Sequence, residues 1–181
     1  SPRFYLPLIG RGVEKMVVRA LPTTCTNSSY IANACNLMRD HYRRMALRTT
    51  QPYPEVPTLL AEIARRKIPL SVLSNKLHEE TLLVVRKIFP RIPFRLVMGL
   101  KPNIPPKPDH AGILAIARSL RCSPRQMIMI GDSEPDMEAA RRSGALPVGV
   151  TWGYRSAQTL ITAGASDLIV RPSALLRYIK P

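Results

Sequence analysis

The pattern of apolar and polar residues changes once along the chain, and the change predicts two structural units. Before it, apolar residues recur at helical spacing over residues 12–21 and over a longer segment that begins near Ser28. Residues 49–54 then form a linker that contains two prolines. We therefore expect residues 1–52 to form a small helical unit and residues 53–181 to form a separate core.

In the second unit, short apolar runs alternate with segments of helical spacing. The predicted strands are residues 68–73, 94–98, 127–130, 146–152 and 167–170. The predicted helices begin at Pro57, about residue 79, Asp109, Ser133, residue 157 and residue 173. Such alternation is typical of an α/β fold with a doubly wound parallel sheet, which is the fold class that we predict.

Acidic residues gather directly after the predicted strand at residues 127–130. Of the twelve carboxylates in this basic chain, four lie between Asp132 and Glu138. Asp132 follows the strand and Asp136 comes about one helical turn later, so both can face the crevice where open α/β sheets bind ligands. Because Mg²⁺ prefers carboxylate oxygens, this pair predicts a Mg²⁺ site. The alternative is a turn in which Ser133 and Asp136 form a capping box and the acids only complement the helix dipole.

Polar residues also follow the predicted strand at residues 68–73 and lie in the proline-rich loop at residues 101–108. The hydroxyl and backbone N–H of Ser74 can donate to a phosphoryl oxygen, and Asn75 can orient a substrate. The alternative for this pair is a simple helix N-cap. Lys107, held between two prolines, can neutralise the charge of a transferring phosphoryl group. Its alternative is an ordinary solvated loop lysine.

Charge and composition narrow the class of partner. The chain has 27 Lys and Arg against 12 Asp and Glu, a net charge of +15. These basic residues are scattered and form no run of five, so we expect an anionic small substrate and no specific nucleic-acid partner. No apolar run is long enough to suggest a membrane span. The three widely spaced cysteines indicate neither a disulfide framework nor a zinc site, and we expect a cytoplasmic location.

Three motifs, in order, resemble those of the haloacid dehalogenase superfamily. Residues 73–76 read Leu-Ser-Asn-Lys, residues 107–109 read Lys-Pro-Asp, and residues 131–136 read Gly-Asp-Ser-x-x-Asp. They are similar to the second, third and fourth motifs of that superfamily. The segments similar to its phosphoglycolate phosphatase-like branch are residues 8–13, 53–57 and 150–154. The resemblance covers nearly the whole chain.

This resemblance implies a haloacid dehalogenase-like fold in which residues 1–52 are part of a helical cap. It also implies a Mg²⁺-dependent phosphatase of small phosphorylated metabolites, with 2-phosphoglycolate as the nearest analogy. The implied roles are phosphoryl binding by Ser74, stabilisation of the nucleophile and phosphoryl oxygens by Lys107, Mg²⁺ ligation by Asp132 with Asp136 in support, and a substrate contact from the cap by Arg11. The motifs predict neither the particular substrate nor the oligomeric state.

One motif of the family is missing from the sequence. The family's first motif, Asp-x-Asp-Gly-Thr, is absent from the 181 residues. In the family it supplies a nucleophilic aspartate, a general acid/base and a metal ligand, and it follows a central strand. We therefore expect the central first strand to be missing between the predicted strands at residues 68–73 and 127–130. The chain is then either an N-terminally truncated phosphatase or a non-catalytic phosphate-binding or interaction protein of the same fold.

Overall fold

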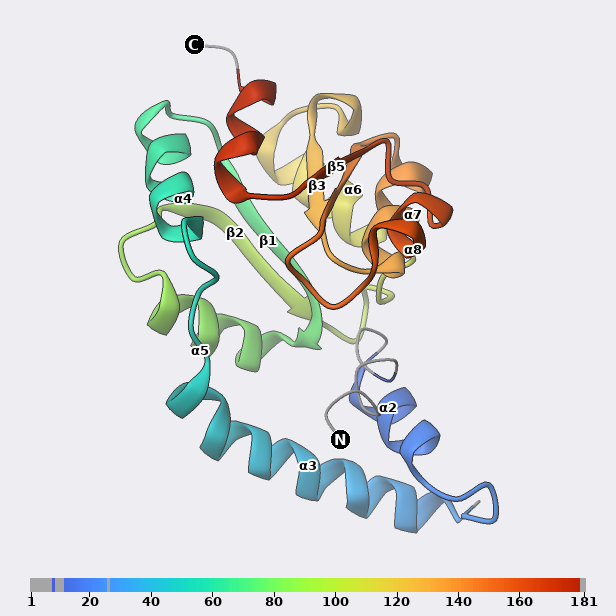
Figure 1. The fold of residues 1–181 in the computed structure, drawn as a ribbon. Coiled ribbons are helices and arrows are strands. Elements are labelled where there is room, and N and C mark those ends of the chain that lie inside the picture. The colour runs from blue at the N-terminus through green and yellow to red at the C-terminus, as the bar shows by residue number, and fades with distance from the viewer. Residues whose placement is uncertain (1–7, 9–11, 26, 180–181) are drawn as a thin grey trace. The chain divides into compact units, whose positions relative to one another are not determined.

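The structure is a computed structural model that describes residues 8, 12–25 and 27–179. The chain divides into two compact units, residues 1–50 and residues 51–181 (Figure 1). No helix among the described residues is long and apolar enough to cross a membrane.

Among its described residues, the first unit contains two α-helices, α2 (Val13–Ala20) and α3 (Ser28–Thr49), as the helical spacing predicts. The side chain of Asn27 caps α3, because its Oδ1 accepts hydrogen bonds from the backbone N–H groups of Ser29 and Tyr30. The two helices pack against each other, with Val17 of α2 and Cys35 of α3 buried.

The second unit alternates helices and strands, and the predicted α/β class is confirmed. Its strands are β1 (Leu70–Leu77), β2 (Phe94–Leu100), β3 (Ile128–Gly131), β4 (Leu146–Val150) and β5 (Asp167–Ile169). Its helices are α4 (Val56–Arg65), α5 (His78–Ile88), α6 (Ala111–Leu120), η2 (Pro124–Gln126), α7 (Glu134–Ser143), α8 (Ala157–Thr162) and η3 (Pro172–Tyr178). All strand pairs are parallel, but they form two sheets among the described residues, β1–β2 and β3–β4–β5.

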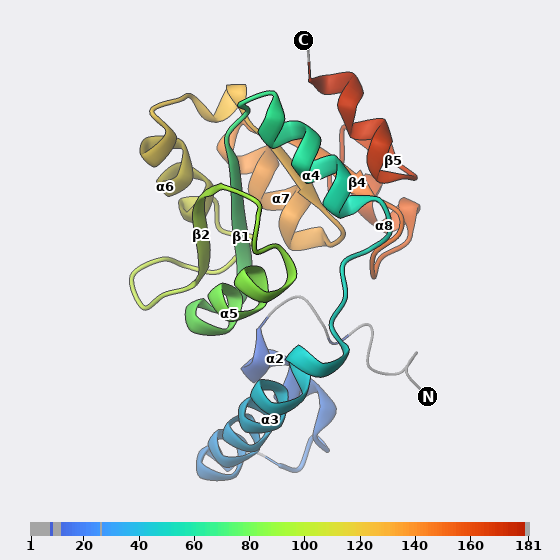
Figure 2. The ribbon, with the colours of Figure 1, turned by 90° about the vertical axis from the view of Figure 1, so that its left-hand side faces the viewer.

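Helices cover the strands from both sides (Figure 2). On one side, α4 and η3 contribute Leu59, Ile63 and Leu175, which pack against Val148 of β4 and Ile169 of β5. On the other side lie α6 and α7, whose buried cluster is Ile113, Ala139, Ala140 and the neighbouring Ala145. Each cluster also contacts residues of both β1 and β3, so both clusters pack against both of the sheets formed by the described residues.

A hollow separates the edge of β1 from the edge of β3. It has a volume of about 400 Å³, and its lining is mostly apolar, from Leu70 and Leu73 of β1 and from residues 128–130 of β3. The hydroxyl oxygen of Ser71 in β1 is buried and has no hydrogen-bond partner in the part of the chain that the structure describes. Ile130 of β3 is 41% exposed. This is the place where the sequence predicts that a central strand is missing.

Some boundaries differ from the prediction. Strand β1 begins at Leu70 and continues through residues 74–76 to Leu77, because an irregular register between Leu73 and Leu77 lets it stay paired with β2. Strand β4 ends at Val150, two residues early, because the chain turns there.

The last predicted helix, η3, is a 3₁₀ helix. At both of its ends the hydrogen bonds span three residues, from Ala174 N–H to the Arg171 carbonyl and from Ile179 N–H to the Leu176 carbonyl.

Candidate active site

The site lies where β1 and β3 end and the loop before α6 meets them. Ser74 and Asn75 belong to the irregular part of β1, whereas Lys107 belongs to the loop between β2 and α6. Asp132 directly follows β3, and Asp136 lies in the first turn of α7. The carboxyl ends of parallel strands are where open α/β sheets bind their ligands.

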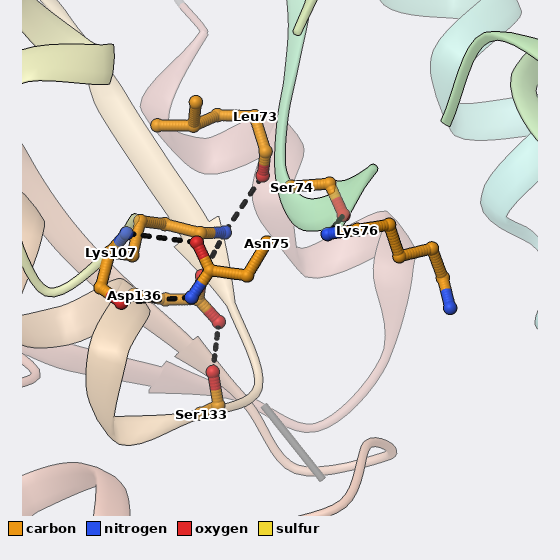
Figure 3. Close-up of polar contacts among 7 residues, drawn as sticks. All are labelled: Leu73, Ser74, Asn75, Lys76, Lys107, Ser133 and Asp136. Carbon is orange, nitrogen blue, oxygen red and sulfur yellow. Dashed lines mark hydrogen bonds and ion pairs between the residues drawn. The ribbon is translucent and has the colours of Figure 1, made fainter. Parts of the chain in front are cut away.

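Lys107 is fixed at both its backbone and its ammonium group (Figure 3). Its Nζ donates to the carbonyl oxygen of Leu73 at 2.7 Å and to Asp136 Oδ1 at 2.6 Å. The side-chain amide of Asn75 donates to the Lys107 carbonyl and accepts from the Lys107 N–H, both at 2.8 Å. Only 10% of the Lys107 side chain is exposed, so it is not an ordinary solvated loop lysine.

Asp136 is the buried partner of this cation. Its side chain is 8% exposed, and its Oδ2 accepts a hydrogen bond from the Ser133 hydroxyl at 2.6 Å. A Cβ on Gly131 would lie 2.3 Å from the Cβ of Asp136, so the approach of β3 to α7 requires glycine there. The alternative interpretation, a capping box at Ser133 and Asp136, is wrong, because the Ser133 side chain makes no cap hydrogen bond to the backbone. Its hydroxyl is engaged by the carboxylate of Asp136 instead.

The carboxylate of Asp132 is held by the loop that follows β4. The backbone N–H of Tyr154 donates to Asp132 Oδ2 at 3.0 Å, and a Cβ on Gly153 would lie 2.2 Å from the Asp132 Cβ. Burial raises the pKa of Asp132, and the charge of Asp136 adds to this effect. Burial also raises the pKa of Tyr53, with smaller contributions from Tyr154 and Asp132, so Tyr53 lies near this end of the site.

The structure brings together most of the residues singled out by the sequence. Lys107, Asn75 and Asp136 form one network, and Asp132 interacts electrostatically with both charged members of it. The Ser74 hydroxyl accepts a hydrogen bond from the Lys76 N–H at 3.1 Å. Arg11, the expected contact from the cap, lies outside the described residues.

Other residues of the site were not expected from the sequence. They are the carbonyl of Leu73, the hydroxyl of Ser133, the Gly153–Tyr154 backbone, and an ion pair between Glu134 and Arg155. Residues 150–154 resemble the family in sequence, but neither spacing nor composition connects them to Asp132. Only the folded chain brings these two segments together.

The described residues fit one part of a magnesium site. Asp132 offers hard carboxylate oxygens in a buried position, and a bound cation would favour the charged form that burial disfavours. Both oxygens of Asp136 already have partners. Within the described ranges, no three His, Cys, Asp or Glu side chains are grouped so that they could hold a metal ion. A Mg²⁺ ion at Asp132 would take further ligands from water or from substrate oxygens.

Comparison with known proteins identifies the family. A sequence profile of the haloacid dehalogenase-like hydrolases matches residues 5–150. The phosphoglycolate phosphatase of Aquifex aeolicus is 28% identical over 162 residues, which are 90% of this chain and 75% of that protein. The phosphoglycolate phosphatase of Neisseria meningitidis is 30% identical over 150 residues, which are 81% of this chain and 63% of that protein.

Solved structures show the same fold. A protein from Lactobacillus delbrueckii that is assigned as a phosphoglycolate phosphatase superposes with a TM-score of 0.90 at 24% identity, over 99% of this chain and 83% of that one. CbbY from Rhodobacter sphaeroides, in complex with phosphate, superposes with a TM-score of 0.76 at 19% identity, over 97% of this chain and 80% of that one. The chain therefore belongs to the haloacid dehalogenase-like hydrolases, and its relatives place it in the phosphoglycolate phosphatase-like branch of that family.

Proposed function

We propose that this protein is a Mg²⁺-dependent phosphatase of small phosphorylated metabolites, with 2-phosphoglycolate as the first candidate substrate. The reaction proceeds through an aspartyl-phosphate whose aspartate lies on a strand outside the 181 residues. That strand occupies the hollow between β1 and β3, so its carboxyl end reaches Lys107 and Asp132.

The observation that carries the proposal is the fixed ammonium group of Lys107 at the carboxyl ends of the strands. A buried lysine held by Leu73 and Asp136 is a preorganised positive charge. Such a charge stabilises the oxygens of a transferring phosphoryl group and also lowers the pKa of a carboxylate nucleophile beside it. The pairing with Asp136 keeps the ammonium group in place before substrate arrives.

Ser74 supplies a second contact with the phosphoryl group. Its oxygen already accepts a hydrogen bond from the Lys76 N–H, so the hydroxyl proton remains able to donate to a phosphoryl oxygen. Asn75 acts indirectly in this arrangement, because its amide holds the backbone of Lys107.

Asp132 is the residue of this chain that would hold Mg²⁺, with Asp136 in support through the Lys107 pair. When bound, the metal ion neutralises charge on the phosphoryl oxygens and orients them for in-line attack. The Tyr154 N–H fixes the direction of the Asp132 carboxylate by donating to its Oδ2.

The test is hydrolysis by the chain extended at its N-terminus with an apolar strand that ends in Asp-x-Asp. Release of inorganic phosphate is measured from 2-phosphoglycolate and from a panel of other phosphomonoesters, with Mg²⁺ and with EDTA. We expect Mg²⁺-dependent release that Asp132→Asn abolishes. Release that is indifferent to EDTA and to Asp132→Asn would refute the proposal.

A second outcome favours the non-catalytic alternative. The described site has a paired cation and two carboxylates that already have hydrogen-bond partners, and this arrangement can bind an anion without attacking it. Phosphate binding that depends on Lys107, together with no hydrolysis of any ester by the extended protein, would indicate a phosphate-binding protein of the same fold.

A further inference from the structure

Arg155 and Glu134 join the two segments that meet at Asp132. Arg155 Nε donates to Glu134 Oε2 at 2.7 Å, and the two side chains are 14% and 28% exposed. Arg155 belongs to the loop after β4, and Glu134 is the first residue of α7. The ion pair is therefore partly buried, where a charge-assisted hydrogen bond is stronger than on an open surface.

The ion pair is next in sequence to the contact that orients Asp132. Tyr154, whose N–H donates to Asp132 Oδ2, directly precedes Arg155. Glu134 lies two residues after Asp132. The two contacts thus connect the same pair of segments, and fixing one of them limits how far the other can open.

The other contacts of the loop described by the structure lie near its two ends and at Gly153. Strand β4 ends at Val150, and the Thr151 N–H makes the last ladder-like hydrogen bond, to the Ile169 carbonyl at 3.1 Å. Beyond it, Gly153 touches Asp132, and Tyr154 is half exposed. The loop regains regular structure only at α8, where Ser156 caps the helix.

We propose that Arg155, through its ion pair with Glu134, is a positioning residue that holds the Tyr154 N–H on the carboxylate of Asp132. It acts on the proposed Mg²⁺ site without touching the metal, and in that respect the inference rests on the proposed function. Residues that orient a metal ligand in this way contribute to metal affinity. Arg155 thereby fixes the position of this loop beside Asp132.

The first measurement needs no metal. Hydrogen exchange of the Tyr154 amide is measured in the full 181-residue chain and in Arg155→Met. We expect its protection to fall by about tenfold or more, the effect of losing a charge-assisted hydrogen bond that keeps the amide closed. Arg155→Lys keeps the charge and a donor, so it should restore part of the protection.

A matched control lies on the same helix. Arg142 and Glu138 form an ion pair at 3.5 Å on the more exposed face of α7, with side chains 51% and 29% exposed. Arg142→Met removes an ion pair from α7 but leaves the loop alone. Tyr154 exchange in this variant should match that of the wild type.

The second measurement is Mg²⁺ affinity by calorimetry, with Asp132→Asn as the variant without a site. We expect the Kd of Arg155→Met to rise by about tenfold or more and that of Arg142→Met to stay unchanged. If the wild type shows no Mg²⁺ binding that depends on Asp132, the metal proposal fails, while the exchange experiment still decides the role of Arg155.

Two results would overturn the positioning role. One is equal Tyr154 protection in the wild type and in Arg155→Met. The other is a loss of protection spread evenly over the amides of β3, β4 and α7, which would make the ion pair a general support of the fold. Should Arg155→Met fail to fold, Glu134→Gln, which removes the charge of the partner, carries the same comparison.

Discussion

The charges of Lys107 and Asp136 are in contact at a place where both side chains are almost fully buried. Removing two charges from water costs several kcal/mol for each ion, and their attraction compensates only when the remaining hydrogen-bonding groups are satisfied. Here Leu73 accepts a hydrogen bond from Lys107 and Ser133 donates one to Asp136, so each charged group has one further partner. An apolar pair would fill the same space at lower cost, so this arrangement is better explained by binding of an anion than by stability.

The buried charge pair predicts how Lys107 variants behave. Lys107→Met leaves Asp136 as a buried charge without its cation, so unfolding free energy in urea should fall by about 3–5 kcal/mol. Lys107→Met with Asp136→Asn removes both charges and should recover much of that loss. Phosphate or tungstate binding should be lost in both variants, because both lack the cation.

The control for that experiment is Arg118→Met, which removes one exposed charge from α6. If phosphate affinity falls equally in Arg118→Met and Lys107→Met, the anion is attracted by the net charge of +15 rather than by the site.

A different carboxylate provides a pH test of stability. Hydrogen bonds from Arg65, and then from Arg66, lower the pKa of Glu62 to about 2 from its ordinary value of 4.5. Because the folded-state pKa is the lower one, the stabilisation is complete above pH 4.5 and is lost as the pH falls toward 2. The urea midpoint of Glu62→Gln should therefore lie below that of the wild type at pH 6 and converge with it near pH 2.

Glu79→Gln is the matched control, since it neutralises an exposed carboxylate at the start of α5. If the difference in urea midpoint between Glu62→Gln and the wild type persists unchanged at pH 2, the arginine contacts do not act through the charge of Glu62.

At the scale of elements, local sequence pattern predicts most of the core. Apolar runs and helical spacing locate each strand there and every helix except the short η2, and Gly144 ends α7 in the left-handed conformation that glycine favours. Local pattern does not reveal that β1 continues through Ser74 and Asn75, because that extension depends on pairing with β2. Local pattern also does not reveal that the Ser133 hydroxyl binds Asp136 and leaves the helix uncapped, because the Asp136 carboxylate becomes buried only in the fold.

The loop after β4 is the element that sequence alone could not connect to the site. Its glycine is tested by Gly153→Ala, whose Cβ would lie 2.2 Å from the Cβ of Asp132. We expect this variant to displace the loop and to lose the gain in Tm that Mg²⁺ gives the wild type. At a Mg²⁺ concentration ten times Kd, binding stabilises the wild type by about 1.4 kcal/mol. For a chain of this size, that raises Tm by roughly 3–6 °C.

Gly144→Ala separates this effect from general destabilisation. Gly144 has φ +85°, and a Cβ there would meet nothing closer than 3.8 Å, so the substitution adds backbone strain of about 1–2 kcal/mol without a clash. Its Tm should fall, yet its Mg²⁺ gain should equal that of the wild type. Equal Mg²⁺ gains in Gly153→Ala and the wild type would exclude the loop from the metal site.

At the scale of the whole core, the two sheets stand as halves of one doubly wound sheet. Strands β1 and β3 each pair on one side only within the described chain, and the hollow between them is lined mostly by apolar side chains. A parallel strand in this position would pair with both edges and cover the exposed Ile130. It would also end beside Lys107 and Asp132, at the carboxyl ends of the strands.

The unextended chain should therefore have no measurable phosphatase activity. Asp132 and Asp136 are both held by hydrogen bonds within the site, and neither lies on the strand position between β1 and β3. Robust Mg²⁺-dependent release of phosphate from 2-phosphoglycolate by the 181-residue protein would show that the nucleophile lies among these residues.

Restoring the strand should raise both stability and activity, and a single substitution in it should separate the two effects. Each buried backbone group that the strand pairs removes a cost of about 1–3 kcal/mol, so several pairs on two edges rival the stability of an ordinary domain. A chain extended by an apolar strand ending in Asp-x-Asp should gain both a higher urea midpoint and activity. With the first Asp of that motif changed to Asn, the same extension should keep the gain in stability and lose the activity, because the strand still pairs but no nucleophile attacks phosphorus. An extension that restores activity without raising the urea midpoint would place the added carboxylate somewhere other than between β1 and β3.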